Sequence, residues 1–256
     1  MSFPNPYNFE QYVLWHNQEV EPGSDIITEI NSIMEALKQN RDRFEKLAQL
    51  LENLNAVLLR AKQTADEDVS SYKCEIQLTT QLSPDQYNSI FKSPESIIDK
   101  LWRKNKDTTV FTTSQNIKRN IKDLARSSII MSTHNFANDF SKALPNWRQK
   151  FELNNIPLED FANITEIKVE QEAKMASGYF AYHADVIYDD GIHVEIQIYS
   201  QLNEVWRGLS HKLYEKTRLH QDVEYGHGTS ASRLVSLGHL LHLAECEAER
   251  LQSDLE

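Results

Sequence analysis

The chain has 256 residues, of which 27 are Lys or Arg and 38 are Asp or Glu, so its formal net charge is −11. Apolar residues make up 40% of it, an ordinary share for a globular protein, which excludes a fully disordered chain. The sequence has no run of about 18 apolar residues, and its start lacks the pattern of a secretion signal. We therefore expect a cytoplasmic protein that does not enter a membrane.

Basic residues are concentrated in one segment, although the chain as a whole is acidic. Between residues 100 and 126 this segment holds Lys100, Arg103, Lys104, Lys106, Lys118, Arg119, Lys122 and Arg126, against Asp107 and Asp123. The net negative charge argues against a protein that coats nucleic acid without sequence preference, because such a protein needs a basic surface. The basic segment leaves two interpretations open, a site for a small anionic ligand or a solvated helix face.

The N-terminal part is predicted to be mainly helical. Apolar residues recur at helical spacing from residue 26 to residue 61, which predicts one long helix or two helices with a break near Asn40. A short strand is expected at 72–78. Ser93 and Pro94 favour a helix start, and this helix is expected to reach about Lys104. Four polar residues share one face of it: Ser96, Lys100, Arg103 and Lys104.

Further strands are expected at 127–132, 164–169, 179–188 and 192–199. The last two are joined by Asp189-Asp190-Gly191, and a three-residue turn with glycine in the left-handed region is a common hairpin connection. This turn fixes a register in which the two strands pair their apolar residues on one face, whereas a slip of one residue would bury Glu195. The opposite, polar face then holds Tyr179, His183, Glu195 and Gln197.

Helices at 206–216 and 230–255 are predicted to complete the chain. The resulting fold class is α+β, with a small mixed, largely antiparallel sheet flanked by helices. We expect three regions: a mainly helical part at 1–89, the central domain at 90–218, and a helix within 219–256 that packs on it.

Two acids indicate the chemistry. Glu195 lies on an otherwise apolar strand and shares a face with His183, while Asp123 precedes another strand. Two acids at strand edges beside a basic helix suit Mg²⁺-dependent phosphoryl transfer, since carboxylates hold the metal and cations neutralise phosphate charge. The alternative is an unremarkable glutamate on an exposed sheet face. The sequence has no Gly-rich phosphate loop, so a P-loop kinase is excluded.

Several segments, in this order, resemble the synthetase domain of RelA/SpoT proteins. They are residues 92–104, Asp123-Leu124-Ala125, the Gly-Tyr-x-x-x-His motif at 178–183, the Val-Glu-Ile-Gln-Ile segment at 194–198, and residues 211–216. The resemblance covers roughly residues 90–218, and the compact length is similar to that of small alarmone synthetases. It implies a nucleotidyltransferase-like fold and a pyrophosphokinase that moves the β,γ-diphosphate of ATP to the 3′-hydroxyl of GDP or GTP.

The resemblance also implies roles for individual residues. Asp123 and Glu195 would be catalytic and would hold Mg²⁺. The ATP phosphates would be bound by Ser96, Lys100, Arg103 and Lys104, and the acceptor by Tyr179, His183 and Gln197. The family has two adenine-binding arginines at the positions of Ile90 and Ser128. Arg126 lies two residues before Ser128, and residues two apart on a strand share a face. We therefore expect Arg126 to contact the adenine in place of the missing arginines.

Three functions follow from these features. The first is an alarmone synthetase with ATP and a guanine nucleotide as its substrates. The second is a toxin of the same family that pyrophosphorylates the 3′ end of tRNA and is neutralised by an antitoxin partner. The third, motivated by the two missing arginines, is a catalytically inactive homologue that senses nucleotides or binds a partner. A homo-oligomer is compatible with each of them.

Overall fold

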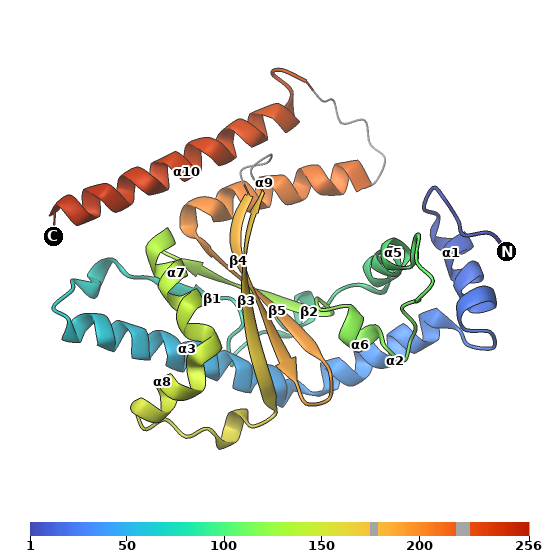
Figure 1. The fold of residues 1–256 in the computed structure, drawn as a ribbon, viewed down its shortest axis with the longest axis horizontal. Coiled ribbons are helices and arrows are strands. Elements are labelled where there is room, and N and C mark those ends of the chain that lie inside the picture. Colours follow the sequence, from blue (N-terminus) through green and yellow to red (C-terminus); the bar gives the residue numbers. More distant parts are fainter. Residues whose placement is uncertain (175–178, 219–225, 256) are drawn as a thin grey trace.

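The computed structural model describes residues 1–174, 179–218 and 226–255. The fold is α+β, as predicted: a five-stranded mixed sheet in the order β1-β2-β5-β4-β3 is flanked by helices (Figure 1). β2 runs parallel to β5, and the other neighbouring pairs are antiparallel. The strands are β1 (Cys74–Ile76), β2 (Ala125–Met131), β3 (Ile164–Lys174), β4 (Tyr179–Tyr188) and β5 (His193–Ser200).

The helices follow one another in three groups. Before the second strand lie α1 (Phe9–Trp15), α2 (Ile26–Gln39), α3 (Arg41–Thr64), α4 (Pro84–Ser89), α5 (Pro94–Asn105) and α6 (Ile117–Asn120). α7 (His134–Ala143) and α8 (Trp147–Leu153) connect β2 to β3, and α9 (Gln201–Arg218) and α10 (Ser230–Leu255) follow β5. Short 3₁₀ or π turns occupy 16–20, 69–71, 144–146 and 159–161. Over the described ranges, no helix combines the length and apolar character that a membrane span requires.

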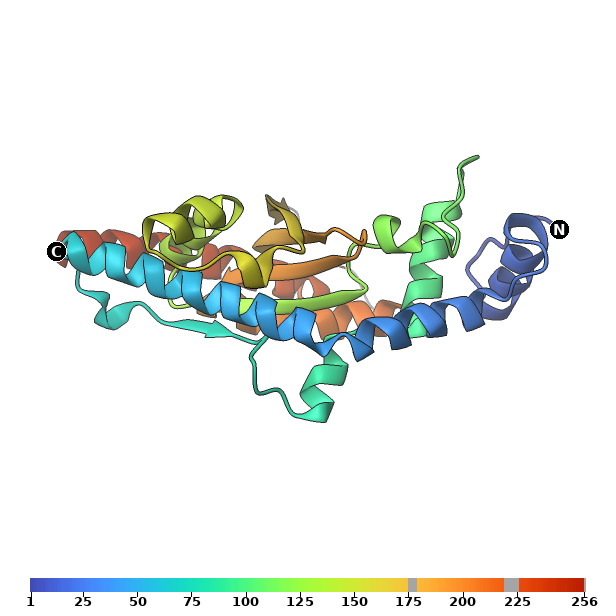
Figure 2. The same ribbon diagram turned by 90° about the horizontal axis from the view of Figure 1, so that it is seen from below.

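The break predicted near Asn40 separates α2 from α3. Asn40 has a non-helical backbone conformation, and its side chain accepts a hydrogen bond from the backbone N–H of Arg43 at 3.3 Å. Such a cap satisfies one of the free N–H groups at a helix start. Figure 2 shows the two helices following each other along the long axis of the molecule, whose described ends lie far apart.

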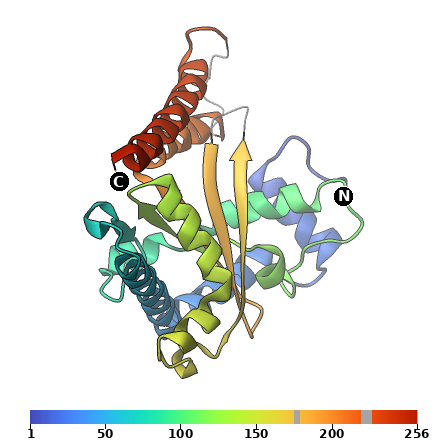
Figure 3. The same cartoon turned by 60° about the vertical axis from the view of Figure 1, so that its left-hand side comes forward.

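One face of the sheet carries the apolar core. Phe136 and Phe140 of α7 are fully buried, as are Leu47, Leu51 and Leu54 of α3, and they join Ile129, Ala184 and Ile196 of the sheet in one continuous cluster. Figure 3 shows α3 and the α7–α8 segment on the same side of the strands. Each buried leucine or phenylalanine contributes about 1.5–3 kcal/mol of transfer free energy. The N-terminal helices and the sheet therefore share one core, which leaves the opposite sheet face available for polar groups.

The β4–β5 hairpin has the predicted register. Val186 pairs with Val194, and Gly191 adopts a φ of +78° in the turn, a value that favours glycine. The turn is held to the helical layer by Arg43 of α3, whose Nη2 lies 2.5 Å from Asp190 Oδ2. The guanidinium carbon of Arg43 also lies 4.5 Å from the ring centroid of Tyr188. These contacts fix one end of the hairpin, and with it the position of the side chains along both strands.

Two strands differ from the prediction by several residues in length, while β2 begins two residues earlier than predicted. β1 covers only Cys74–Ile76 because it is an edge strand that pairs with just the last part of β2. β3 runs on to Lys174, beyond the predicted end at residue 169. Its second half is charged and pairs with β4, so apolar periodicity carries no signal there.

Candidate functional site

The sheet face opposite the apolar core brings together polar groups from three neighbouring strands. Arg126 of β2 lies beside Glu195 of β5 in the parallel register, and Ser128 lies beside Gln197. The antiparallel strand β4 places His183 beside Gln197 on the other flank. Because side chains alternate between faces along a strand, these residues project to the same side. The predicted polar face therefore extends across β2, β5 and β4.

Asp123 lies just before β2 and is held by two lysines. Its Oδ2 is 2.8 Å from Lys92 Nζ, and its Oδ1 is 2.6 Å from Lys100 Nζ, which comes from α5. Burial acts to raise the pKa of Asp123, but the two ammonium groups outweigh it and lower the pKa to about 2. Burial lowers the pKa of Lys92, an effect that Asp123 opposes. Asp123 is therefore an ionised carboxylate with a cation at each oxygen.

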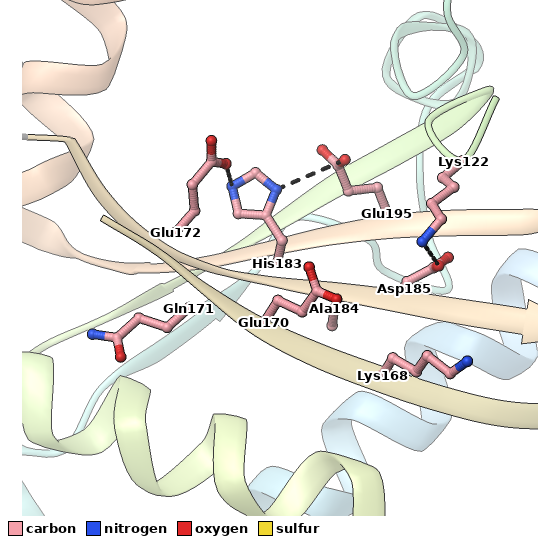
Figure 4. Close-up of a pocket in the computed structure, with 9 residues that line it drawn as sticks. All are labelled: Lys122, Lys168, Glu170, Gln171, Glu172, His183, Ala184, Asp185 and Glu195. Carbon is pink, nitrogen blue, oxygen red and sulfur yellow. Dashed lines mark ion pairs between the residues drawn. The ribbon is translucent and has the colours of Figure 1, made fainter. Parts of the chain in front are cut away.

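Glu195 and His183 form a second cluster, shown in Figure 4. His183 Nε2 lies 3.0 Å from Glu172 Oε2, and His183 Nδ1 lies 3.8 Å from Glu195 Oε2. The other oxygen of Glu195 accepts a hydrogen bond from Gln197 Nε2 at 2.5 Å. Burial acts to raise the pKa of Glu195, but His183 and Gln197 together lower it, while the charge of Asp123 acts to raise it. Glu195 is thus ionised and within electrostatic reach of Asp123.

A pocket of about 400 Å³ opens beside this cluster, and we refer to it as the Glu195 pocket. Asp185 in its wall is fixed by Lys122 Nζ at 3.0 Å and by His193 Nδ1 at 2.7 Å. Carboxylates outnumber lysines in the lining, so the pocket offers mainly hydrogen-bond acceptors. It is lined by Lys122, Lys168, Glu170, Gln171, Glu172, His183, Ala184, Asp185 and Glu195 (Figure 4).

A second pocket of about 370 Å³ involves β2 and α9, and we refer to it as the Arg126 pocket. Arg207 of α9 donates through Nη2 to Gln197 Oε1 and through Nη1 to the Tyr199 hydroxyl, the latter at 2.7 Å. The side chain of Gln197 therefore connects Arg207 of this pocket to Glu195 of the other. The Arg126 pocket is lined by Gln77, Leu82, Gln86, Ser89, Ile90, Arg126, Ser127, Ser128, Ile130, Tyr199, Glu204 and Arg207.

The acids suit a metal ion that arrives with phosphate groups. Mg²⁺ in proteins is commonly bound by one or two carboxylates together with substrate phosphates. Asp123 and Glu195 are two ionised carboxylates that fit this requirement. Within the part of the chain that the structure describes, no group of three or more His, Cys, Asp or Glu residues could hold a metal by itself. The donor set therefore fits Mg²⁺ bound jointly with a ligand rather than a closed protein site.

The structure brings some of the predicted site residues together and leaves others apart. Asp123 and Lys100 are in contact, Glu195 contacts His183 and Gln197, and Arg126 lies next to Glu195. Ser96 remains at the start of α5, where its backbone N–H donates to the Ser93 side chain. Arg103 pairs with Asp99 of its own helix at 2.7 Å, and Lys104 is exposed. Tyr179 begins β4, but its side chain lies outside the described residues.

Three residues in this arrangement were not identified as site residues from the sequence. Lys92 opens the motif at 92–104, so its position beside Ser93 could have indicated a role. Glu172 lies in the charged half of β3, where only the pairing with β4 brings it toward His183. Arg207 carries no sequence signal because its contacts depend on how α9 crosses the sheet.

The chain is similar to several known proteins. A family model described as a region found in RelA/SpoT proteins matches residues 89–219. The small alarmone synthetase 1 of Bacillus subtilis is 19% identical, with 81% of this chain and 92% of that chain covered and a TM-score of 0.46. A GTP pyrophosphokinase family protein of Streptococcus pneumoniae is 16% identical, with 82% and 91% covered and a TM-score of 0.48. No curated protein matches the chain.

The family match carries the assignment. It spans about half of the chain and includes Lys92, Asp123, His183, Glu195 and Gln197. These are residues that the fold gathers before β2 and along the polar face of the sheet. The chain belongs to the RelA/SpoT family.

Proposed function

We propose that the chain is a pyrophosphokinase that transfers the β,γ-diphosphate of ATP to the 3′-hydroxyl of a guanine nucleotide. The proposal rests chiefly on the two pockets that Gln197 connects. Transfer between two nucleotides needs two adjacent sites that hold the reacting groups together. An ionised carboxylate where the sites meet can accept the proton of the attacking hydroxyl. Glu195 has this position, since it lines one pocket and lies beside Arg126 of the other.

The Arg126 pocket is the proposed donor site. A guanidinium group can stack on an aromatic base, so Arg126 is suited to hold the adenine where Ile90 and Ser128 replace the arginines of the family. Lys92 and Lys100 lie at Asp123, where ammonium groups would neutralise phosphate charge. Ser96, Arg103 and Lys104 are proposed to contribute to the same phosphates from α5.

The Glu195 pocket is the proposed acceptor site. A guanine base offers N–H donors at its Watson–Crick edge, and the carboxylates of Glu170 and Glu172 are acceptors in the pocket wall. Lys122 and Lys168 supply cations for the phosphates of the acceptor. Tyr179 is proposed to stack on the base, and His183 and Gln197 to border the site.

The proposed reaction is an in-line displacement at the β-phosphorus of ATP. The 3′-oxygen of the acceptor forms the new bond to the β-phosphorus, the bond from that phosphorus to the α,β-bridging oxygen breaks, and AMP leaves. The hydroxyl proton passes to the ionised carboxylate of Glu195, whose Oε2 faces His183. Asp123 and Glu195 would hold Mg²⁺, which supplies charge neutralisation at the phosphate oxygens when bound.

The acceptor can be identified with ATP labelled in its γ-phosphate. The chain is incubated with this ATP and GDP, GTP or bulk tRNA, and the products are separated. We expect label in the guanine nucleotide. Label in tRNA alone would replace this proposal with the toxin of the same family. Absence of label in both, with ATP binding preserved, would replace it with a nucleotide-sensing homologue.

A further inference from the structure

We propose that Arg207 is a positioning residue that fixes the amide of Gln197 and, through it, the carboxylate of Glu195. The inference rests on the proposed transfer reaction and assigns a role to a residue outside the predicted site. The contacts form a continuous series from α9 to β5. Arg207 Nη2 donates to Gln197 Oε1, and Gln197 Nε2 donates to Glu195 Oε1 at 2.5 Å.

The two ends of the Gln197 amide differ in what they can bond. A guanidinium only donates hydrogen bonds, and an ionised carboxylate only accepts them. With Arg207 at one end and Glu195 at the other, a single amide orientation satisfies both contacts. The flipped orientation would place the amide nitrogen against the guanidinium and the amide oxygen against the carboxylate. Gln197 is also nearly buried, at 8% exposure, so water cannot readily replace a lost partner.

Arg207 is itself held in place, which allows it to orient another group. Its Nη1 donates to the Tyr199 hydroxyl at 2.7 Å, and its guanidinium carbon lies 4.8 Å from the centroid of the Tyr199 ring. The preceding residue, Trp206, is buried and donates through Nε1 to the carbonyl of Leu234 in α10 at 2.8 Å. At this segment, α9 is therefore anchored to β5 through Arg207 and to α10 through Trp206.

The consequence concerns the two oxygens of Glu195. The hydrogen bond from Gln197 occupies Oε1, while Oε2 faces His183 across 3.8 Å. Holding one oxygen fixes the direction of the other, Oε2, which is the oxygen not occupied by Gln197 and therefore the one that would receive the acceptor proton. Catalysis depends steeply on such orientation, since small displacements of a reacting group reduce the rate strongly. Loss of Arg207 should therefore affect turnover more than nucleotide affinity.

The test separates this role from direct binding of ATP, because Arg207 also lines the Arg126 pocket. We expect Arg207→Met to lower kcat about ten-fold or more, with the affinity for a non-hydrolysable ATP analogue within about three-fold of wild type. Arg207→Lys retains one donor and should recover part of the lost kcat.

Gln197→Leu should lower kcat by a similar factor, and the Arg207→Met, Gln197→Leu double variant should have a kcat no lower than that of either single variant. Lys212→Met removes an exposed cation from the same helix and should change neither quantity.

Two kinetic results would overturn the assignment. One is an Arg207→Met chain with normal kcat and weakened ATP binding, which would make Arg207 a binding residue. The other is a double variant whose losses multiply. Thermal unfolding of each variant controls for the fold.

A second readout does not depend on transfer activity. The side-chain amide signal of Gln197 in a ¹⁵N–¹H spectrum can be assigned by its loss in Gln197→Leu. It should shift or broaden in Arg207→Met and stay unchanged in Lys212→Met. An unchanged signal in Arg207→Met would refute the positioning role. If the wild-type chain transfers nothing yet this signal responds as expected, the proposed function has failed and the Arg207–Gln197 contact has not.

Discussion

Lys100 Nζ lies 2.6 Å from Asp123 Oδ1, and this contact links the basic helix α5 to the acid that precedes β2. Lys92 approaches the second oxygen of the same carboxylate at 2.8 Å. The negative charge of Asp123 offsets the repulsion between the two ammonium groups. An incoming triphosphate offers them further anionic partners, so the same lysines that hold Asp123 are placed to receive phosphate charge.

Lys100→Met should therefore weaken ATP binding. Loss of a charge-assisted contact to phosphate is expected to raise the Kd for ATP about ten-fold, at about 1.4 kcal/mol per decade. Titration with a non-hydrolysable ATP analogue measures this. Lys106→Met is a matched control, because Lys106 lies just past the end of the same helix and packs over Trp102 instead. Equal affinities for wild type and Lys100→Met would remove Lys100 from the donor site.

The ion pairs of Asp123 with Lys92 and Lys100 should make the free energy of unfolding depend on pH. The pKa of Asp123 is about 2 in the folded chain, below its ordinary value of 3.8. The ion pairs of ionised Asp123 stabilise the folded chain at any pH above the ordinary pKa of the group. Their contribution is lost as the pH falls toward the pKa that Asp123 has in the folded chain, so the free energy of unfolding should decline between about pH 4 and pH 2. The loss is of order 2 kcal/mol.

Denaturant titrations across this pH range measure the decline. Asp123→Asn lacks the ionisable group and should show a smaller decline over the same interval. The same slope in both chains would show that Asp123 does not carry the effect.

Loss of either acid should stop the transfer. Glu195→Gln and Asp123→Asn each remove one charge from the proposed metal site, and Glu195→Gln also removes the proton acceptor. We expect both substitutions to abolish transfer. The thermal unfolding profile of Glu195→Gln should stay close to that of wild type, whereas Asp123→Asn should unfold at a lower temperature because it loses its ion pairs with Lys92 and Lys100. The assay measures label transfer at saturating ATP and acceptor. A Glu195→Gln chain with the wild-type rate would refute the role of Glu195.

The donor pocket should depend on Arg126. If Arg126 contacts the adenine from β2, Arg126→Ala should raise the apparent KM for ATP about ten-fold or more. Ser128→Arg restores a guanidinium at a family position on the same face of the strand, so it should leave the KM unchanged or lower it. ATP titrations at saturating acceptor compare the three chains. Unaltered ATP dependence in Arg126→Ala would mean that Arg126 does not replace the missing arginines.

Tyr179 offers a test of which side binds the acceptor. Stacking of an aromatic ring on a base is worth about 1–3 kcal/mol, so Tyr179→Ala should weaken acceptor use by roughly ten- to a hundred-fold. ATP binding should change little. If ATP affinity fell and acceptor use were preserved, the assignments of donor and acceptor sides would have to be exchanged.

The fold was largely predictable because its strongest signals are local. Apolar spacing and the capping residue Asn40 define α2 and α3, and the turn at Gly191 fixes the β4–β5 register. The ends of β1 and β3 were not predictable, since β1 is limited by its short pairing with β2 and β3 is charged along its second half. The division of the chain at residues 89 and 218 stays a prediction.

The candidate site was only partly predictable for a related reason. His183, Glu195 and Gln197 lie on one hairpin, so strand alternation alone places them together. Lys92 and Lys100 meet at Asp123 only through the way the chain places the segment before α5, and α5 itself, beside the residue that precedes β2. Arg207 reaches Gln197 from a helix that crosses the sheet, a contact that no periodicity encodes.

The central claim is that a diphosphate moves as one unit from ATP to the acceptor, and the position of the label in ATP tests it most directly. Parallel reactions would contain a guanine nucleotide and ATP labelled in the α-, β- or γ-phosphate. We predict that label from the β and γ positions appears in the guanine nucleotide in equal amounts, while label from the α position stays in AMP. Transfer of the γ label without the β label would contradict the account, since it would mean that a single phosphoryl group moves.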